Sequence, residues 1–161
     1  MPLTVQSLEV YPIALTYVEP LKTSFGDQTL KAAVVVRLCS AEGICGWGEA
    51  SVELRPGYGS ETVGTAIHII RNFIEPLLVG QTFADPHAVA AVLRSIRGHH
   101  HTRAGVEAAA WDAFAQLHDL SLARYFATFL PDGHAPRPVA SVGVSIGMKP
   151  TIEASLDIIR K

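Results

Sequence analysis

Residues 31–50 read KAAVVVRLCSAEGICGWGEA, and this stretch predicts the centre of a β-sheet. The run from Ala32 to Val36 is dense in β-branched residues, which is typical of a central strand. Ala41-Glu42-Gly43 then forms a tight turn, and the chain returns through Ile44 to Ala50. The two segments, Lys31 to Cys39 and Ile44 to Ala50, are therefore expected to form an antiparallel hairpin.

A further strand is expected before this hairpin, at Val5 to Leu15, where Pro12 indicates an edge position or a break. The sheet is thus predicted to have three strands and to be mostly antiparallel. Two connections, Tyr17 to Thr29 and Ser51 to Glu61, are longer than hairpin turns require. Long loops on a small rigid sheet often carry binding residues, so both are candidates for that role.

After Gly59 the apolar residues recur with the period of a helix. We predict a helix that is capped by Ser60 and ends before Pro76, a second from Asp85-Pro86 to about Arg97, a third over Thr102 to Leu117, and a short one over Leu122 to Phe129 that Ser121 caps. Within the third helix, Gly105 is expected to cost up to about 1 kcal/mol relative to alanine. Strands followed by helices give residues 1–131 an α+β fold.

The chain beyond residue 131 has a different pattern. Its prolines and a glycine indicate a linker over residues 132–138. Pro138 to Gly147 is apolar on both sides, as in a parallel strand buried between layers, and Pro150 to Lys161 has the apolar stripe of a covering helix. Such a unit cannot bury its own faces, so residues 139–161 are predicted to begin a second domain whose remainder is missing. Its exposed apolar surface would favour association, including a homo-oligomer.

Composition excludes some classes of partner. The 161 residues are 48% hydrophobic and carry a formal net charge of -2, so there is no basic surface that would suggest nucleic acid. No apolar stretch approaches the roughly 20 residues of a membrane span, and the N-terminus lacks the features of a secretory signal, which predicts a cytoplasmic protein without a membrane partner. Cys39 and Cys45 could face each other across the hairpin. In a reducing compartment, however, we expect two buried thiols rather than a disulfide or metal site.

The residues alone provide no catalytic set. His99-His100-His101 cannot converge easily on one ion, because adjacent side chains point in different directions. Glu107 and Asp112 lie on different faces of the third helix and are interpreted as a hydrogen-bond anchor and a solvated or packing acid. Gly46-Trp47-Gly48-Glu49 is interpreted as a packing motif at a strand end rather than as a source of a catalytic Glu49. Phosphate-binding loops and nucleophile motifs are absent from the sequence.

An ordered series of motifs identifies a family. The series is KTSFG at residues 22–26, GWGE at 46–49, ELRPGY at 53–58, VGQTFADP at 79–86, GVEAAAWD at 105–112 and GVSIG at 143–147. In this order it resembles the N-terminal part of an enolase-superfamily protein of the muconate-lactonizing subgroup. The branch it resembles contains o-succinylbenzoate synthases and N-acylamino-acid racemases.

The resemblance implies an α+β capping domain packed on a modified TIM-type barrel, of which residues 139–161 would be the first strand and helix. The two long loops would then cover a small carboxylate substrate. Leu21 takes the place of an apolar pocket residue, and Phe25 lies in the same loop. Glu53 and Tyr58 would lie near the mouth, and Ser145 would border the acyl or succinyl arm. Leu21 and Tyr58 could instead pack the loops, and Ser145 could bond to backbone.

The chemistry of the family is proton abstraction next to a carboxylate, with Mg²⁺ stabilising the enediolate and lysines acting as acid and base. The resemblance places those lysines and the metal carboxylates on later barrel strands, beyond Lys161. We therefore expect no catalytic residue and no metal ligand in this chain, and no activity from the chain by itself. The sequence leaves open whether the substrate is dehydrated, as in menaquinone biosynthesis, or racemised. It also leaves open a free-standing capping or assembly module that binds a separately encoded barrel, and a degenerate fragment without function.

Overall fold

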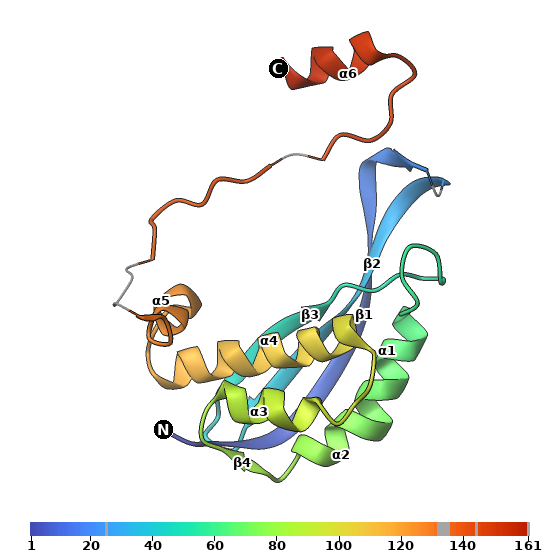
Figure 1. Ribbon diagram of the computed structural model, residues 1–161. Coiled ribbons are helices and arrows are strands. Elements are labelled where there is room, and N and C mark those ends of the chain that lie inside the picture. The colour runs from blue at the N-terminus through green and yellow to red at the C-terminus, as the bar shows by residue number, and fades with distance from the viewer. Residues whose placement is uncertain (25, 132–135, 144, 161) are drawn as a thin grey trace. The chain divides into compact units, whose positions relative to one another are not determined.

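The computed structural model describes residues 1–24, 26–131, 136–143 and 145–160 (Figure 1). The chain divides into two compact units. The first unit consists of Met1–Ile13 and Ala32–Pro136, and the second unit consists of Ala14–Lys31 and Arg137–Lys161. The predicted α+β fold with an antiparallel sheet is confirmed. Residues 132–135 of the predicted linker lie outside the described residues, so the domain boundary at 132–138 stays a prediction.

The sheet has the strand order β3-β2-β1-β4. The strands are β1 (Leu3–Thr23), β2 (Gly26–Ser40), β3 (Cys45–Ala50) and β4 (Thr82–Phe83). The predicted β2–β3 hairpin is confirmed, with antiparallel pairs running from Val34 opposite Ala50 to Cys39 opposite Cys45. Strand β4 adds a short antiparallel pairing to the start of β1. Two residues are too few to give a periodic signal, so this fourth strand was not predicted.

The prediction of a long loop over Tyr17 to Thr29 is wrong. Strand β1 continues to Thr23 and β2 already begins at Gly26, so only two residues separate the strands. Gly26 has a positive φ of 114°, and its carbonyl accepts a hydrogen bond of 2.8 Å from the Thr23 hydroxyl. Pro12 is accommodated in β1 because the register with β4 covers only Leu3 and Thr4, leaving β1 an edge strand at that point.

The first predicted helix is three consecutive segments, α1 (Val63–Ile69), the π-helical η1 (Ile70–Ile74) and α2 (Glu75–Leu78). Its cap is Thr62 rather than Ser60. The Thr62 hydroxyl accepts from the Thr65 amide at 3.2 Å, while the Thr62 amide donates to the Thr65 hydroxyl at 2.8 Å. The expected stop before Pro76 is also wrong, because Pro76 lies in the first turn of α2, where an amide donor is not needed.

The remaining helices follow the predictions closely. They are α3 (Pro86–Leu93), α4 (His100–Leu117), α5 (Leu122–Ala127) and α6 (Ile152–Ile159). Asp85 caps α3 by accepting from the Ala88 amide at 2.9 Å, and Ser121 caps α5. Helix α3 ends before the expected Arg97. The caps were predictable because they depend on short-range residue types.

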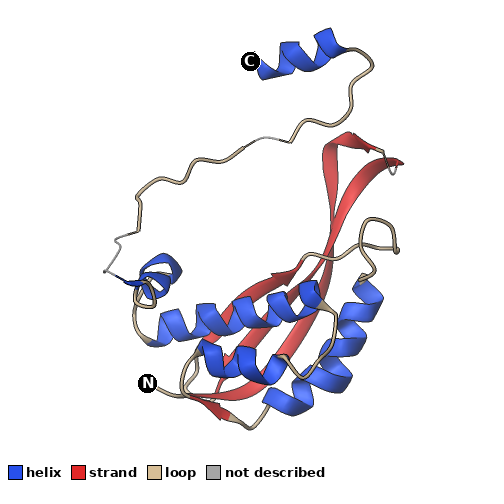
Figure 2. Cartoon of the chain, in the orientation of Figure 1, coloured by secondary structure: helices blue, strands red, loops and turns tan. Residues whose placement is uncertain are grey.

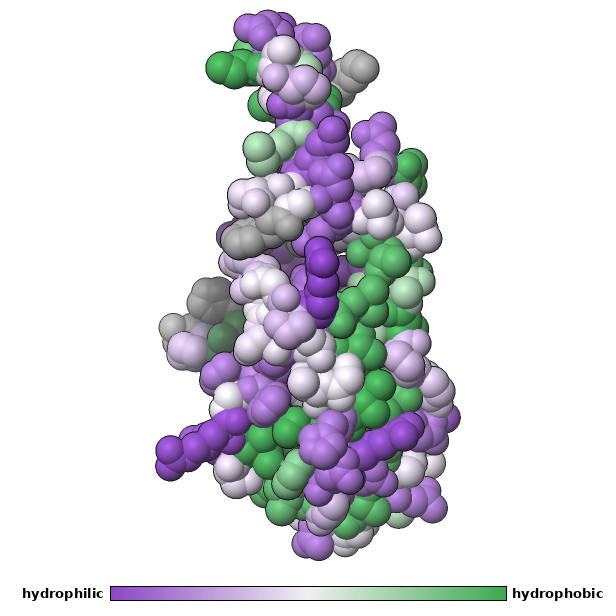
Figure 3. All heavy atoms as spheres, turned by 90° about the vertical axis from the view of Figure 1, so that its right-hand side faces the viewer, coloured by the Kyte–Doolittle hydropathy of each residue, from purple (hydrophilic) through white to green (hydrophobic). Residues whose placement is uncertain are grey.

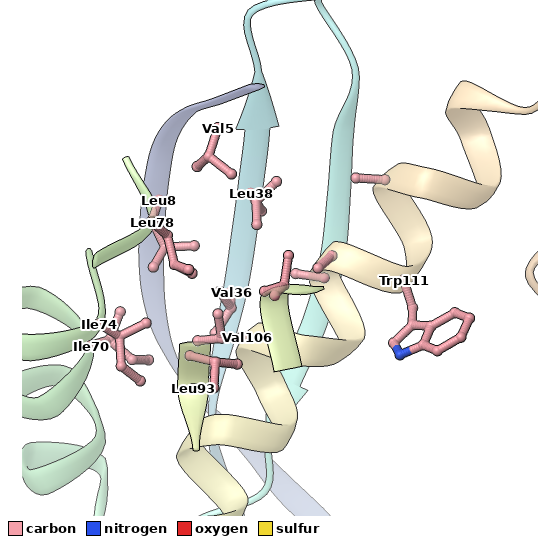
Figure 4. Close-up of a cluster of buried hydrophobic side chains, with 14 of the residues drawn as sticks. Val5, Leu8, Val36, Leu38, Ile70, Ile74, Leu78, Leu93, Val106 and Trp111 are labelled. Atoms are coloured by element: carbon pink, nitrogen blue, oxygen red, sulfur yellow. The ribbon is translucent and has the colours of Figure 1, made fainter. Parts of the chain in front are cut away.

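The helices of the first unit cover one face of the sheet (Figure 2). Figure 4 shows the resulting core, in which Val36 and Leu38 of β2 lie among apolar side chains from several helices. The other labelled core residues are Val5, Leu8, Ile70, Ile74, Leu78, Leu93, Val106 and Trp111. Of these labelled residues, Leu8 and Trp111 retain 6% and 8% exposure and the rest at most 1%, so this layer of contacts stabilises the unit.

Helix α4 packs directly on β3 through glycines. A Cβ atom on Gly46 would lie 2.1 Å from the Ala109 carbonyl oxygen, and one on Gly48 would lie 2.0 Å from that of Gly105. A Cβ on Gly105 would lie 2.6 Å from the Ala50 amide nitrogen. The packing role expected for the Gly-Trp-Gly motif is therefore confirmed. The treatment of Gly105 as only a helix cost is corrected, since contact between the two backbones requires a glycine there.

The prediction of two free thiols is also wrong. Cys39 and Cys45 are directly paired across the hairpin, with Cα atoms 4.1 Å apart, and form a disulfide. Residues at directly opposite positions of an antiparallel pair have the shortest separation in a sheet, which allows this bond.

The strand expected over Pro138 to Gly147 is not formed by the described residues 138–143 and 145–147. A parallel strand must pair its backbone groups with a neighbouring strand, and the described residues of this segment take no place in the strand order β3-β2-β1-β4. The expected helix is present as α6, where the Thr151 hydroxyl accepts from the Ala154 amide at 3.1 Å. Among the described residues, none of the helices has the length and apolar character that crossing a membrane would require.

Candidate functional site

The second unit contains an open pocket of about 930 Å³. Strand β1 contributes its end, residues 17–22, and the opposite wall is the segment 145–150 together with Ile158 of α6. The pocket contains two of the predicted site residues, Leu21 and Ser145. Their separation of more than a hundred positions in the sequence means that only the fold brings them into one pocket.

Two polar contacts hold the segment 145–150 against β1. The Met148 amide donates to the Lys22 carbonyl at 2.9 Å. The Lys149 ammonium lies 3.7 Å from a Glu19 carboxylate oxygen. The approach at Gly147 is also close, because a Cβ atom there would lie 3.0 Å from Leu21 Cδ1 and 3.1 Å from the Lys22 amide nitrogen, and a neighbour would have to shift by a few tenths of an ångström.

The pocket lining is mixed in character. It combines apolar residues such as Leu21 and Met148 with Ser145, the lysines Lys22 and Lys149, and the carboxylates Glu19 and Asp27. Ligand pockets are commonly apolar with a few polar groups that fix orientation. Ammonium and hydroxyl groups donate hydrogen bonds to an anion, whereas the two carboxylates accept them from a donor.

The second predicted loop, Ser51 to Glu61, belongs to the first unit. Backbone hydrogen bonds join its two ends, and we call the residues so joined, Glu53 and Glu61 to Val63, the base of the loop. The Glu53 amide donates to the Glu61 carbonyl at 3.3 Å, and the Val63 amide donates to the Glu53 carbonyl at 2.9 Å. A parallel bridge also pairs Glu53 with Thr62. Beyond this base the loop is open to solvent, with Leu54 60% and Tyr58 83% exposed.

Glu61 is a residue that the sequence did not single out. Its carboxylate is buried, with 7% of the residue exposed, and accepts from the amides of His101 and Thr102 at 2.9 Å each. The Thr102 hydroxyl donates a third bond of 2.6 Å. Burial acts to raise the pKa of Glu61, but the bonds from Thr102 and His101 outweigh it, so the pKa is lowered. The partners are 40 residues away, and no local pattern indicates such a pair.

The acidic residues of α4 have structural partners, but the expected roles are exchanged, because Asp112 rather than Glu107 is the hydrogen-bond anchor. Asp112 accepts from the Trp47 amide at 2.9 Å and so joins α4 to β3, while Glu107 accepts from the Trp111 indole at 3.4 Å. Across the residues that the structure describes, no group of three His, Cys, Asp or Glu side chains is arranged to hold a metal ion.

The predicted site residues are thus not all in one place. Leu21 and Ser145 share the pocket of the second unit, whereas Glu53 and Tyr58 belong to the loop of the first unit. Phe25 lies outside the described residues. The assignment of these five residues to a substrate pocket stays a prediction.

Known proteins similar to this chain were identified in three ways. The family model described as "Mandelate racemase / muconate lactonizing enzyme, N-terminal domain" matches residues 7–126. An o-succinylbenzoate synthase from Listeria innocua is 33% identical over 91% of the chain, and an N-succinylamino acid racemase from Amycolatopsis is 28% identical over 94%. A crystal structure of an enolase-superfamily member from Listeria innocua matches 98% of the chain with a TM-score of 0.87 and 32% identity. The chain spans only 37%, 39% and 41% of these proteins, respectively.

Proposed function

The chain belongs to the mandelate racemase / muconate lactonizing enzyme N-terminal domain family, and from this premise we propose that it is the substrate-capping part of an enzyme of the o-succinylbenzoate synthase or N-succinylamino acid racemase type. One observation carries the proposal. The similarity covers 91% of this chain but 37% of the Listeria innocua synthase, so it is confined to one part of a longer enzyme. The chain therefore supplies enclosure, and a barrel domain supplies the reacting groups.

The contribution of this chain is to bind and cover a small carboxylate substrate. The pocket of the second unit supports this role because Leu21 gives it an apolar wall and Ser145 gives it a hydroxyl donor. From the resemblance to the family, the exposed loop with Glu53 and Tyr58 is proposed to be a substrate-covering loop of the complete enzyme. Enclosure excludes water from a reaction whose intermediate carries developing negative charge.

The family is generally Mg²⁺-dependent, and the ion would stabilise an enediolate. The described residues of this chain do not offer a matching set of ligands, since no three metal-ligating side chains converge. From the resemblance to the family, we assign the metal ligands and the acid–base lysines to the barrel domain, and we propose that this chain by itself is inactive.

The test compares the chain alone with a chimera. The chimera joins this chain in frame to the part of the Listeria innocua synthase that follows the matched region, and the full-length synthase is the positive control. Each protein is assayed with Mg²⁺ for dehydration of the cyclohexadiene precursor of o-succinylbenzoate and for racemisation of an N-succinylamino acid. We expect turnover by the chimera and none by the chain. Turnover by the pure chain, or a folded chimera without either activity, would contradict the proposal.

The same design addresses a barrel supplied as a separate polypeptide. The barrel part is co-expressed with this chain instead of being fused to it. Co-purification with turnover supports a free-standing capping module, whereas activity of the fusion alone supports a capping part that must be covalently attached.

A further inference from the structure

We propose that Glu61 is a positioning residue that fixes the base of the loop 54–60 to the first turns of helix α4. The proposal rests on the proposed function only in what the loop covers, because the anchoring itself is a property of the first unit. It assigns to Glu61 a role that is distinct from substrate contact.

The loop is attached to α4 at both ends. At its start, Ala50 ends β3 against Gly105 of α4, where a Cβ on the glycine would lie 2.6 Å from the Ala50 amide nitrogen. At its end, the Glu61 carboxylate takes three hydrogen bonds from His101 and Thr102. Thr102 and Gly105 are three positions apart and so lie on the same side of the helix. One turn of α4 thus holds both ends of the loop.

Glu61 also connects this turn to the rest of the loop base. Its carbonyl accepts from the Glu53 amide, and the next residue, Thr62, caps α1. Figure 1 shows the first turn of α4 beside the start of α1, the helix that Thr62 caps. The N-terminus of a helix has unpaired amides and the positive end of the helix dipole. A buried carboxylate accepts hydrogen bonds from the amides and interacts favourably with the dipole. Removing the charge would therefore release the base of the loop from α4.

In the intact protein, the loop 54–60 therefore has a fixed base and an exposed tip. Leu54 and Tyr58 are 60% and 83% exposed, while Val52 and Glu61 are 2% and 7% exposed. The tip can respond to a ligand, whereas its direction of approach is set by the anchored ends. Glu61 would then affect how the substrate is held rather than how it reacts.

The first experiment measures amide hydrogen exchange of Glu53 and Val63 in the full 161-residue chain. Glu61→Gln and Thr102→Val should accelerate both amides by at least about tenfold, because each removes charge-assisted bonds from the anchor. Thr102→Ser keeps the hydroxyl and should restore protection. Asp112→Asn is the matched control. The Asp112 carboxylate also accepts from a backbone amide and holds α4, but its partner is Trp47 of β3 rather than a residue of the loop base.

Equal acceleration in Asp112→Asn, or unchanged exchange in Thr102→Val, would overturn the proposal. If Glu61→Gln does not fold, the exchange rates measured in Thr102→Val still test the proposal. The second experiment places Glu61→Gln in the chimera, where we expect a higher KM at a similar kcat, and a lower kcat at unchanged KM would contradict a positioning role. An inactive chimera would count against the proposed function, while the exchange result would still decide the role of Glu61.

Discussion

Positions 38 and 156 are both leucine, but they lie in two regions with opposite environments. Leu38 lies in the first unit and is fully buried, whereas Leu156 of α6 in the second unit is 40% exposed. The difference is general, since every buried hydrophobic residue among the described ones belongs to the first unit. Figure 3 shows one face of the molecule, on which hydrophobic side chains lie at the surface among hydrophilic ones. An apolar pattern becomes a core only where another element covers it.

The largest effect is expected at the contact between β3 and α4. Gly48→Ala would place a Cβ atom 2.0 Å from the Gly105 carbonyl oxygen, so the helix must move off the sheet. We expect the free energy of unfolding to fall by at least about 3 kcal/mol in urea titration. Gly64→Ala is the control, since its nearest neighbour would be 3.8 Å away, and we expect it to stabilise α1 slightly. Similar losses in both variants would refute the packing role.

Truncating the two leucines tests the comparison itself. Leu38→Ala should cost about 2–5 kcal/mol, because it leaves a cavity in the core. Leu156→Ala should change the free energy of unfolding by less than about 0.5 kcal/mol, because the side chain is already in contact with water. Chemical denaturation of both variants provides the measurement. A comparable loss at Leu156 would mean that the second unit has its own core.

The pH dependence of the first unit should depend in part on Glu61. Its folded-state pKa lies below the ordinary value of 4.5, so its stabilising effect is complete above that pH and is lost as pH falls through the folded pKa. At pH 7, Glu61→Gln should cost about 2 kcal/mol through the lost charge-assisted bonds. The gap between wild type and variant should narrow as the pH falls below 4.5 towards the lowered folded-state pKa of Glu61. A gap that is constant down to pH 3 would exclude ionisation of Glu61 as its origin. Coulombic attraction to His101 also contributes to the lowered pKa of Glu61.

Reduction of the disulfide should have a smaller effect than the substitutions at Gly48 and Leu38. Cys39 and Cys45 are six positions apart and already paired in the hairpin, so the bond restricts only a short loop of the unfolded chain. We expect dithiothreitol to lower the free energy of unfolding by about 1–2 kcal/mol. Thiol titration of the purified chain is the accompanying check, and two free thiols before reduction would contradict the bond.

Features that depend on neighbouring residues were predicted correctly more often than features that depend on a distant partner. The hairpin, the Asp85 and Ser121 caps and the extent of α4 depend on neighbouring residues, so they were predictable. The strand predicted over Pro138 to Gly147 is not formed by the described residues, because strand formation depends on a partner that the pattern of the segment itself does not specify.

The candidate site was only partly predictable for a related reason. The motif order identified the family and drew attention to Leu21 and Ser145, which the fold brings into one pocket. Glu61 was missed because its role depends on the amides of His101 and Thr102, which are far away in the sequence. Long-range backbone contacts of this kind leave no periodic signal.

The central claim is that the second unit is completed by a barrel. Amide hydrogen exchange of this chain, alone and as the chimera with the Listeria innocua barrel part, tests it most directly. We predict that residues 34–38 are protected in both proteins, and that residues 145–159 exchange rapidly in the chain alone but become protected in the chimera. Equal protection of residues 145–159 in the chain alone, or rapid exchange there in a folded chimera, would contradict the account.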